Sequence, residues 1–130
     1  SGPLLDRIDI QVEVPALKFA AFRARGEAES SAAIKARVTA ARERQRARFA
    51  GKGIFANVQM GVREIREFCR IGPDGEKLLE AAVARLGFSA RAYDRSLKVA
   101  RTIADLGGAE EISAAHLAEA IQYRAMDRYY

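Results

Sequence analysis

The N-terminal residues carry a strand pattern that nothing later in the chain can complete. From Ile8 to Val14, apolar side chains alternate with Asp9, Gln11 and Glu13. A period of two is typical of a β-strand with one buried face. Such a strand needs a neighbouring strand, but the rest of the sequence is patterned as helix. We therefore expect this segment to be the edge of a larger domain whose sheet lies upstream.

Without that sheet, the N-terminal segment should be extended and poorly ordered to about residue 25. Residues 15–26 have little periodicity and are interpreted as a linker. The whole chain has 130 residues, 49% of them apolar. That is enough for one domain with a modest core.

Composition and charge narrow the class of protein. No stretch approaches the roughly eighteen apolar residues of a membrane span, and no secretory signal is visible. The formal charge of +5 and the pI of about 9.7 favour anionic partners such as nucleotides or nucleic acid. A single cysteine excludes an internal disulfide and suits a reducing compartment, so we expect a cytoplasmic protein. We expect Cys69 in the core and the only histidine, His116, partly exposed on a helix.

Helix starts and stops divide the remainder into five predicted helices. Ser89 and Ser113 are favourable N-caps, and glycines close several segments. The expected helices cover about 31–49, 62–70, 78–86, 89–107 and 113–129. Residues 72–75, Gly-Pro-Asp-Gly, are interpreted as a turn between the second and third helices. Because the last three helices are joined by short loops, we expect a small, mainly α-helical bundle with antiparallel neighbours.

The apolar positions of two helices predict which faces are buried. In the first helix the expected anchors are Ile34, Val38, Ala41 and Phe49, on an otherwise basic surface. In the fourth helix the residues expected in the core are Tyr93, Leu97, Ala100 and Ile103.

The chain by itself lacks the residues of an enzyme. It contains no Gly-x-x-x-x-Gly-Lys-Ser/Thr phosphate loop, and Gly51-Lys52-Gly53 is too short to surround a triphosphate. One cysteine and one histidine far apart are poor support for a nucleophile and its base. No acidic cluster has the spacing of a metal site.

Five segments are distinctive as sequence. They are Ser-Gly-Pro-Leu-Leu-Asp-Arg-Ile-Asp-Ile at 1–10, Arg-Glu-Ile-Arg-Glu-Phe-Cys at 63–69, Leu-Gly-Phe-Ser-Ala-Arg-Ala-Tyr-Asp-Arg at 86–95, Val-Ala-Arg-Thr-Ile-Ala-Asp-Leu at 99–106 and Ala-Glu-Ala-Ile-Gln-Tyr-Arg at 118–124. Together they resemble the C-terminal part of the magnesium-chelatase-like ATPases of bacteria, the ComM/YifB family. The resemblance covers nearly the whole chain.

The resemblance implies a ring-forming AAA+ ATPase related to the ATPase subunit of magnesium chelatase and to the MCM helicases. Residues 1–26 would end the nucleotide-binding core, and residues 27–130 would form the helical lid. The full-length protein would bind ATP and Mg²⁺, form a ring expected to be hexameric, and drive helicase or branch-migration work on DNA in natural transformation. The family's Walker motifs lie upstream, so this piece alone should be monomeric and hydrolyse nothing.

Arg7 lies in Leu-Leu-Asp-Arg-Ile-Asp, which is similar to the segment that holds the arginine finger in the chelatase and MCM relatives. The resemblance therefore implies that Arg7 acts in trans, on the nucleotide of the neighbouring subunit. A planar, permanently charged guanidinium can stabilise the charge that spreads over a departing γ-phosphoryl group. The alternative is a solvated arginine beside a strand.

Arg91 opens the fourth helix, where the relatives carry the sensor 2 arginine that contacts nucleotide bound to the same subunit. Backbone amides and the helix dipole in a first turn also favour an anion. Arg95 and Arg101, further along this helix, are additional candidates for nucleotide contact. Alternatively, these arginines are solvated or pair with Asp94 and Asp105.

The predicted helix at 31–49 is strongly basic, and Lys35, Arg42 and Arg46 are weak candidates for contacts with DNA phosphates. The alternative is a solvated helix face. Two further readings of the chain stay open. It can be a freestanding basic DNA-binding module, or part of an ATPase that remodels a protein partner, as in magnesium chelatase.

Overall fold

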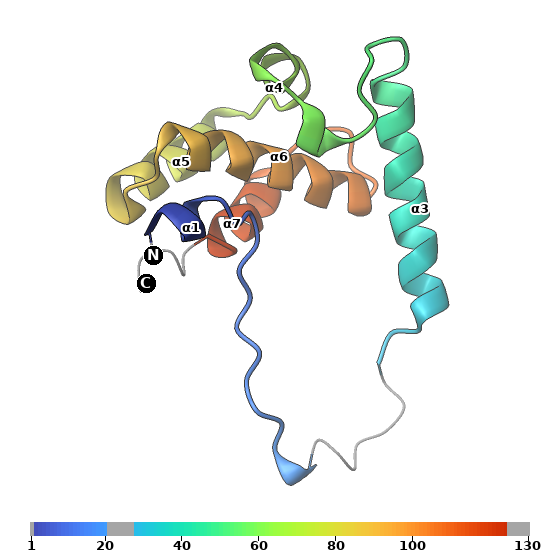
Figure 1. Cartoon of the computed structure of the whole chain (residues 1–130), viewed down its shortest axis with the longest axis vertical. Coiled ribbons are helices and arrows are strands. Elements are labelled where there is room, and N and C mark those ends of the chain that lie inside the picture. Colours follow the sequence, from blue (N-terminus) through green and yellow to red (C-terminus); the bar gives the residue numbers. More distant parts are fainter. Residues whose placement is uncertain (1, 21–27, 125–130) are drawn as a thin grey trace.

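Helices are the regular secondary structure of the residues that the structure describes (Figure 1). The computed structural model describes residues 2–20 and 28–124, and within them there is no β-strand. The helices are α1 (Gly2–Asp6), α3 (Ser31–Arg48), the short 3₁₀ helix η1 (Asn57–Gln59), α4 (Val62–Phe68), α5 (Pro73–Leu86), α6 (Ala90–Leu106) and α7 (Ala114–Gln122). The predicted mainly helical bundle is confirmed. The expected continuation of the last helix toward Tyr129 lies outside the described residues.

Helix α6 is the centre of the fold. It packs against α3, η1, α4 and α7, and α5 in turn packs against α7. Leu117 is fully buried, and Leu79 and Phe49 are only 1% and 2% exposed. Burying a side chain of this kind contributes about 1.5–3 kcal/mol. These side chains come from α7, α5 and the end of α3, and they form one core with Leu97, Ala100 and Ala104 of α6.

Local capping signals set most helix boundaries where the sequence predicts them. The Ser89 Oγ accepts a hydrogen bond from the Ala92 N–H at 3.1 Å, and the Ser113 Oγ accepts one from the His116 N–H at 3.3 Å. Helix α5 ends at Gly87, whose φ of 66° lies in the left-handed region that favours glycine. These contacts confirm the predicted caps.

The start of α5 corrects the sequence analysis. The turn predicted at residues 72–75 is wrong, because Pro73 is the first residue of α5 and Gly72 is its N-cap. Proline suits the first helical position, where its missing N–H leaves no hydrogen bond unmade. Acidic side chains in the first turn add a favourable interaction with the helix dipole, and Asp74 and Glu76 supply them.

Helix α3 corrects the predicted burial of its apolar residues. Ala41 and Phe49 are buried as expected, but Ile34 and Val38 are 42% and 44% exposed. The reason is visible in Figure 1, where the N-terminal part of α3 extends away from the other helices. Only its C-terminal half reaches the body of the domain, so apolar spacing alone overstated the packed surface.

The other predicted core positions are mostly confirmed. Leu97 and Ala100 are buried on α6, whereas Tyr93 is 40% exposed because it borders an open hollow between α4 and α6. Cys69 is buried, and its burial raises the pKa of the thiol to about 11. His116 is partly exposed, and its Nδ1 accepts a hydrogen bond from the Ser113 N–H at 3.0 Å.

Residues 8–18 are extended, as predicted, but the strand predicted within them does not form. The expectation of an extended segment is wrong for Gly2–Asp6, which form the helix α1. Ile10, Val12 and Val14 are 51%, 62% and 86% exposed, so the alternating face is not buried. Among the described residues no strand is present to pair with it. The segment nevertheless contacts the bundle, since the Gln11 N–H donates to the Tyr123 carbonyl at 2.9 Å.

Candidate functional site

Arg7 lies in the turn that follows α1. The turn is closed by hydrogen bonds from the Arg7 N–H to the Leu4 carbonyl and from the Ile8 N–H to the Leu5 carbonyl, both 3.1 Å. The Arg7 side chain is exposed. Its guanidinium has no ion-pair or hydrogen-bond partner in the part of the chain that the structure describes. This cation is therefore available to an external anion.

The backbone on both sides of Arg7 is held by Arg124, just after α7. The Arg124 side chain is fully buried. Its Nη1 donates to the Ile8 carbonyl at 2.9 Å, and its Nη2 donates to the Asp6 carbonyl at 3.0 Å. Hydrogen bonds from a charged donor are stronger than neutral ones. Sequence analysis missed this role, because the contact joins residues more than a hundred positions apart.

The turn that carries Arg7 also contacts the start of α6. The Asp6 Oδ1 accepts a hydrogen bond from the Ser89 Oγ at 3.1 Å, and it lies 3.4 Å from the Arg124 Nη2. Ser89 is the N-cap of α6, and Arg91 is the second residue of that helix. The structure therefore brings the two predicted nucleotide-contacting segments to one junction, which we call the Asp6 junction (Asp6, Ser89 and Arg124).

Arg91 is exposed and has no hydrogen-bond or ion-pair partner within residues 2–20 and 28–124. It lies in the first turn of a 17-residue helix. Backbone N–H groups at such a terminus lack partners inside the helix and favour a negative charge. Arg91 and the Arg7 turn together therefore present two available cations beside a helix start.

Arg95, one turn further along α6, is already occupied. It forms an ion pair and hydrogen bond with Asp9 in the N-terminal segment. Its side chain is only about a quarter exposed, at 26%. Arg95 thus fastens the N-terminal segment to α6 in this structure.

Arg101 is buried and serves the interior of the domain. Its guanidinium donates to the carbonyls of Ala109 at 3.0 Å and Glu110 at 2.9 Å, and it lies 3.3 Å from an Asp105 oxygen. Burial lowers the pKa of Arg101, and the neighbouring Asp105 carboxylate opposes that effect. The pairing with Asp105, one of the alternatives left open by the sequence, is confirmed.

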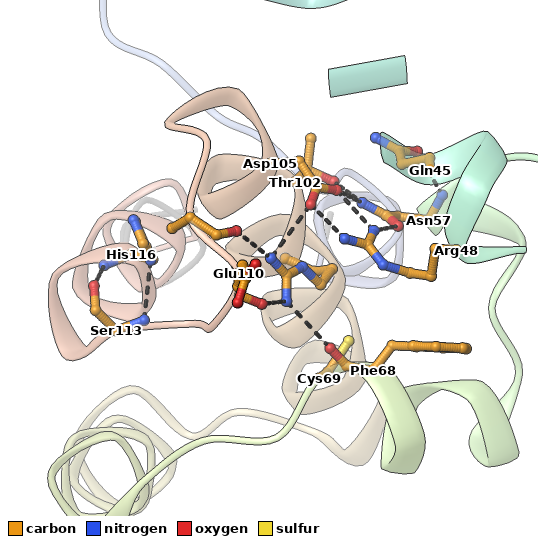
Figure 2. A network of polar contacts seen from close by, with 12 residues as sticks. Gln45, Arg48, Asn57, Phe68, Cys69, Thr102, Asp105, Glu110, Ser113 and His116 are labelled. Carbon is orange, nitrogen blue, oxygen red and sulfur yellow. Dashed lines mark hydrogen bonds and ion pairs between the residues drawn. The ribbon is translucent and has the colours of Figure 1, made fainter. Parts of the chain in front are cut away.

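Asp105 is the centre of a buried polar network (Figure 2). It accepts hydrogen bonds from Arg48 at 2.5 and 2.8 Å and from the Asn57 side chain at 2.9 Å. The Asn57 N–H donates to the Gln45 side chain at 2.9 Å. The network ties α3, η1 and α6 together. Sequence analysis missed it, although Gln45 and Arg48 continue the helical spacing that begins at Ala41.

The charges around Asp105 decide its ionisation. Burial alone would raise the pKa of this carboxyl, but the hydrogen bonds from Arg48 and Asn57 and the nearby Arg101 outweigh burial. The pKa of Asp105 is therefore held below its usual value. The carboxylate stays ionised at neutral pH and acts as a structural anchor.

Three exposed cations line one face of α3. Lys35, Arg42 and Arg46 are separated by seven and four residues, which places them on one side of a helix. They span about 16 Å along its axis. None has an ion-pair partner among the described residues, whereas Arg37 pairs with Glu29 at 2.6 Å. We call this set the basic stripe.

The described residues give no support for a membrane-spanning helix or for a metal site. No helix there is both long and apolar enough to cross a membrane. The same residues contain no group of three or more histidine, cysteine or acidic side chains arranged to hold a metal ion.

Comparison with known proteins identifies the family. Residues 28–124 match the family described as magnesium chelatase, subunit ChlI C-terminal. The chain belongs to this family. Relatives of this magnesium-chelatase C-terminal family include the competence protein ComM of Haemophilus influenzae, which is 45% identical over 98% of the chain. The uncharacterized protein YifB of Salmonella typhimurium is also 45% identical, and that of Escherichia coli is 44% identical, each over 98% of the chain.

The chain spans about a quarter of the length of these curated relatives, 25% in each case. The predicted resemblance to the C-terminal part of ComM/YifB proteins is confirmed. The match to the magnesium-chelatase C-terminal family covers residues 28–124, and this range includes Arg91 and the basic stripe. Arg7 lies before the matched range but within the region similar to ComM and YifB.

Proposed function

We propose that this chain is the helical lid of a ring-forming, cytoplasmic ATPase that remodels DNA. Family membership and the similarity to a competence protein support this proposal. In the full-length protein, an upstream core would supply the phosphate loop and the acidic residues for Mg²⁺. Bound ATP would supply the phosphoryl group, and Mg²⁺ would neutralise part of the phosphate charge. The lid then contributes arginines, in a ring we expect to be hexameric, and the chain alone is an inactive monomer.

The observation that carries the proposal is the arrangement around Arg7. Its side chain is exposed without a partner among the described residues, while the backbone on either side is fixed by Arg124. An available guanidinium carried on a fixed backbone suits an arginine finger, because the turn that carries it needs no ordering before the side chain meets the transferred phosphoryl oxygens. Arg7 would serve the nucleotide of the adjacent subunit.

Arg91 is the proposed contact to nucleotide bound in its own subunit. It combines a cation that has no partner in the described residues with a helix N-terminus, and both favour phosphate. Arg95 is a weaker candidate, because it would reach a phosphate only by releasing Asp9. Arg101 is committed to buried carbonyls and Asp105, so we assign it a structural role in place of nucleotide contact.

The basic stripe is the proposed contact to DNA. Lys35, Arg42 and Arg46 are exposed on a helix that extends from the body, and each can approach a phosphate without breaking an ion pair. Contacts of this kind are independent of base sequence and weaken with salt. Three of them would contribute a slope of about −3 in log K against log salt.

The test is the rate of ATP hydrolysis by the full-length protein. Arg7→Ala should lower kcat on the order of a thousandfold while ATP still binds, since an arginine finger acts in the transition state. Mixing Arg7→Ala subunits with subunits inactivated at the Walker B acid should restore part of the activity, because the intact Arg7 of an inactive subunit can then serve the intact site of an Arg7→Ala subunit. Arg85→Ala, an exposed arginine on α5, is the matched control. Unchanged hydrolysis in Arg7→Ala would refute the assignment.

Arg91→Ala tests the contact in cis. It should weaken nucleotide binding or hydrolysis by the subunit that carries it, and mixing with Walker B variants should not rescue that subunit. Kinetics equal to those of the unmodified protein would remove Arg91 from the site.

The basic stripe also supports a second candidate, a freestanding DNA-binding module. The isolated chain would then bind DNA tightly with a steep dependence on salt, whereas a lid should bind only weakly alone. The relationship to magnesium chelatase leaves a third candidate open, an ATPase that remodels a protein partner. DNA should stimulate the ATPase of a DNA motor, and absence of stimulation would favour the protein-remodelling candidate.

A further inference from the structure

The Asp6 junction connects two segments that the proposed function assigns to nucleotide. We infer that Asp6 and Arg124 are positioning residues that tie the presentation of Arg7 to the start of α6. This inference rests on the proposed function, since it takes Arg7 as the finger and Arg91 as the contact in cis. It adds a physical link between them that runs through residues not otherwise assigned to the reaction.

Arg124 fixes the backbone of Arg7 from the inside of the domain. One guanidinium donates to the carbonyl before Arg7 and to the carbonyl after it, at 3.0 and 2.9 Å. Both distances are those of well-formed hydrogen bonds. Two fixed carbonyls two residues apart leave Arg7 little rotational freedom in its backbone. The direction in which its side chain leaves the turn is therefore set by the C-terminal end of α7.

Asp6 transmits the position of α6 to the same turn. Its carboxylate accepts a hydrogen bond from the Ser89 hydroxyl at 3.1 Å, and that hydroxyl accepts one from the Ala92 N–H at 3.1 Å. The chain of hydrogen bonds thus runs from the first turn of α6 to the residue preceding Arg7. Arg91 is part of that first turn. A shift of the turn when Arg91 meets a phosphate would move Asp6 with it.

A second attachment follows one helical turn later. Arg95 pairs with Asp9, two residues after Arg7. The N-terminal segment is therefore bound to α6 on both sides of the proposed finger, through Asp6 and through Asp9. These contacts span more than eighty positions in the sequence, so they record the tertiary fold rather than local chain geometry.

The inference predicts a specific kinetic behaviour for Arg124→Lys in the full-length ATPase. Lysine keeps the charge but lacks the planar fork that reaches two carbonyls at once. A displacement of a catalytic group by about 1 Å can cost about a hundredfold in rate. We therefore expect Arg124→Lys to lower kcat about ten- to a hundredfold with little change in ATP affinity.

A double-mutant cycle separates positioning from general damage. If Arg124 acts through Arg7, Arg124→Lys should have no further effect on kcat when Arg7 is already alanine. Mixing Arg124→Lys subunits with Walker B-inactive subunits should restore hydrolysis, because the intact fingers then serve the variant's own sites. Arg85→Lys, on the exposed face of α5, is the matched control. A lid that is merely destabilised would lose activity in either background and would not be rescued.

Hydrogen exchange in the same full-length protein gives a readout that does not depend on hydrolysis. Amides of residues 7–11 should exchange about tenfold faster in Arg124→Lys and in Asp6→Ala, while those of residues 41–48 stay unchanged. A non-hydrolysable ATP analogue should slow exchange at residues 7–11 in the unmodified protein but not in Asp6→Ala.

The outcomes distinguish the inference from the proposal beneath it. Full hydrolysis by Arg7→Ala would overturn the finger assignment and the inference with it. A strong defect in Arg7→Ala, combined with normal kcat and normal exchange in Arg124→Lys, would overturn the positioning role alone. A further fall in kcat when Arg124→Lys is added to Arg7→Ala would also overturn the positioning role.

Discussion

Two of the junctions that join an aspartate to arginine in this domain, at Asp105 and at Asp6, differ in how deeply the carboxylate is buried. At Asp105 the carboxylate is fully buried and accepts hydrogen bonds from Arg48 and Asn57. At Asp6 the carboxylate is 36% exposed, meets Arg124 at 3.4 Å and shares a hydrogen bond with Ser89. The first junction joins helices to each other, and the second joins the N-terminal segment to the helices.

The difference shows how similar residues can serve rigidity in one place and adjustment in another. A buried carboxylate that loses its partners leaves uncompensated charge in a medium that solvates it poorly, so the Asp105 network resists rearrangement. A partly exposed carboxylate can exchange a protein partner for water at little cost. The Asp6 carboxylate can therefore exchange its partners while the helical body, including the buried Arg124, stays intact.

Removing the buried carboxylate should have the largest effect. Asp105→Ala leaves Arg48 and Arg101 facing each other without their counterion, and we expect a loss of about 3–5 kcal/mol in the free energy of unfolding. Urea denaturation of the chain measures this, with Glu43→Ala on the exposed face of α3 as control. A loss below about 1 kcal/mol would show that the two junctions do not differ as described.

Low pH should weaken the junction at Asp105. The pKa of Asp105 is lower in the folded chain than the ordinary value of an aspartate, so its contribution to stability is fully present above that ordinary value. It is lost as the pH falls through the lowered folded pKa. Urea midpoints measured from about pH 6 to about pH 2.5 should fall less in Asp105→Asn than in the unmodified chain, because that variant lacks the titrating group. Parallel curves would contradict the assignment.

The partly exposed junction should respond more weakly. Asp6→Ala removes a partly exposed carboxylate, with its long ion pair to Arg124 and its hydrogen bond from Ser89. Because Arg124 keeps its hydrogen bonds to the Asp6 and Ile8 carbonyls, we expect a loss of about 1 kcal/mol or less. Thermal unfolding of the chain gives the value. A loss as large as that of Asp105→Ala would mean that the N-terminal segment is part of the rigid body.

The basic stripe takes part in neither junction and should have the smallest effect on stability. Replacing Lys35, Arg42 and Arg46 with glutamine should change the free energy of unfolding by no more than about 0.5 kcal/mol. Binding of DNA by the full-length protein should weaken, and its salt slope should fall by about 3. The same replacements at Arg63, Arg66 and Arg85, which are also exposed, control for net charge. Equal weakening by both sets would show that the stripe is not a specific surface.

Local signals in the sequence were sufficient for most helix boundaries. Ser89, Ser113 and Gly87 act through contacts within a few residues, so their effect is readable without the fold. The strand pattern at residues 8–14 is also local, but a strand exists only when a second strand pairs with it. Ile34 and Val38 failed as core residues for the same reason, since helical spacing does not say where a neighbouring helix ends.

The polar contacts were the part that sequence could not supply. Arg101 and Asp105 are one helical turn apart, so their pairing was an available alternative. Arg124 meets the carbonyls beside Arg7 across 116 and 118 positions, and no periodicity marks such a contact. Arg7 and Arg91 were singled out by family resemblance, and their common junction became visible only in three dimensions.

The N-terminal half of α3 extends beyond the body of the domain, so it would amplify small rotations of this helix. Residues 31–40 are exposed, while Ala41, Gln45 and Phe49 seat the remainder against the body. Ten helical residues extend about 15 Å, so a tilt of about 10° at the seat would sweep the tip through about 3 Å. A small rotation of α3 about its packed C-terminal half would thus move its N-terminal end by a larger distance.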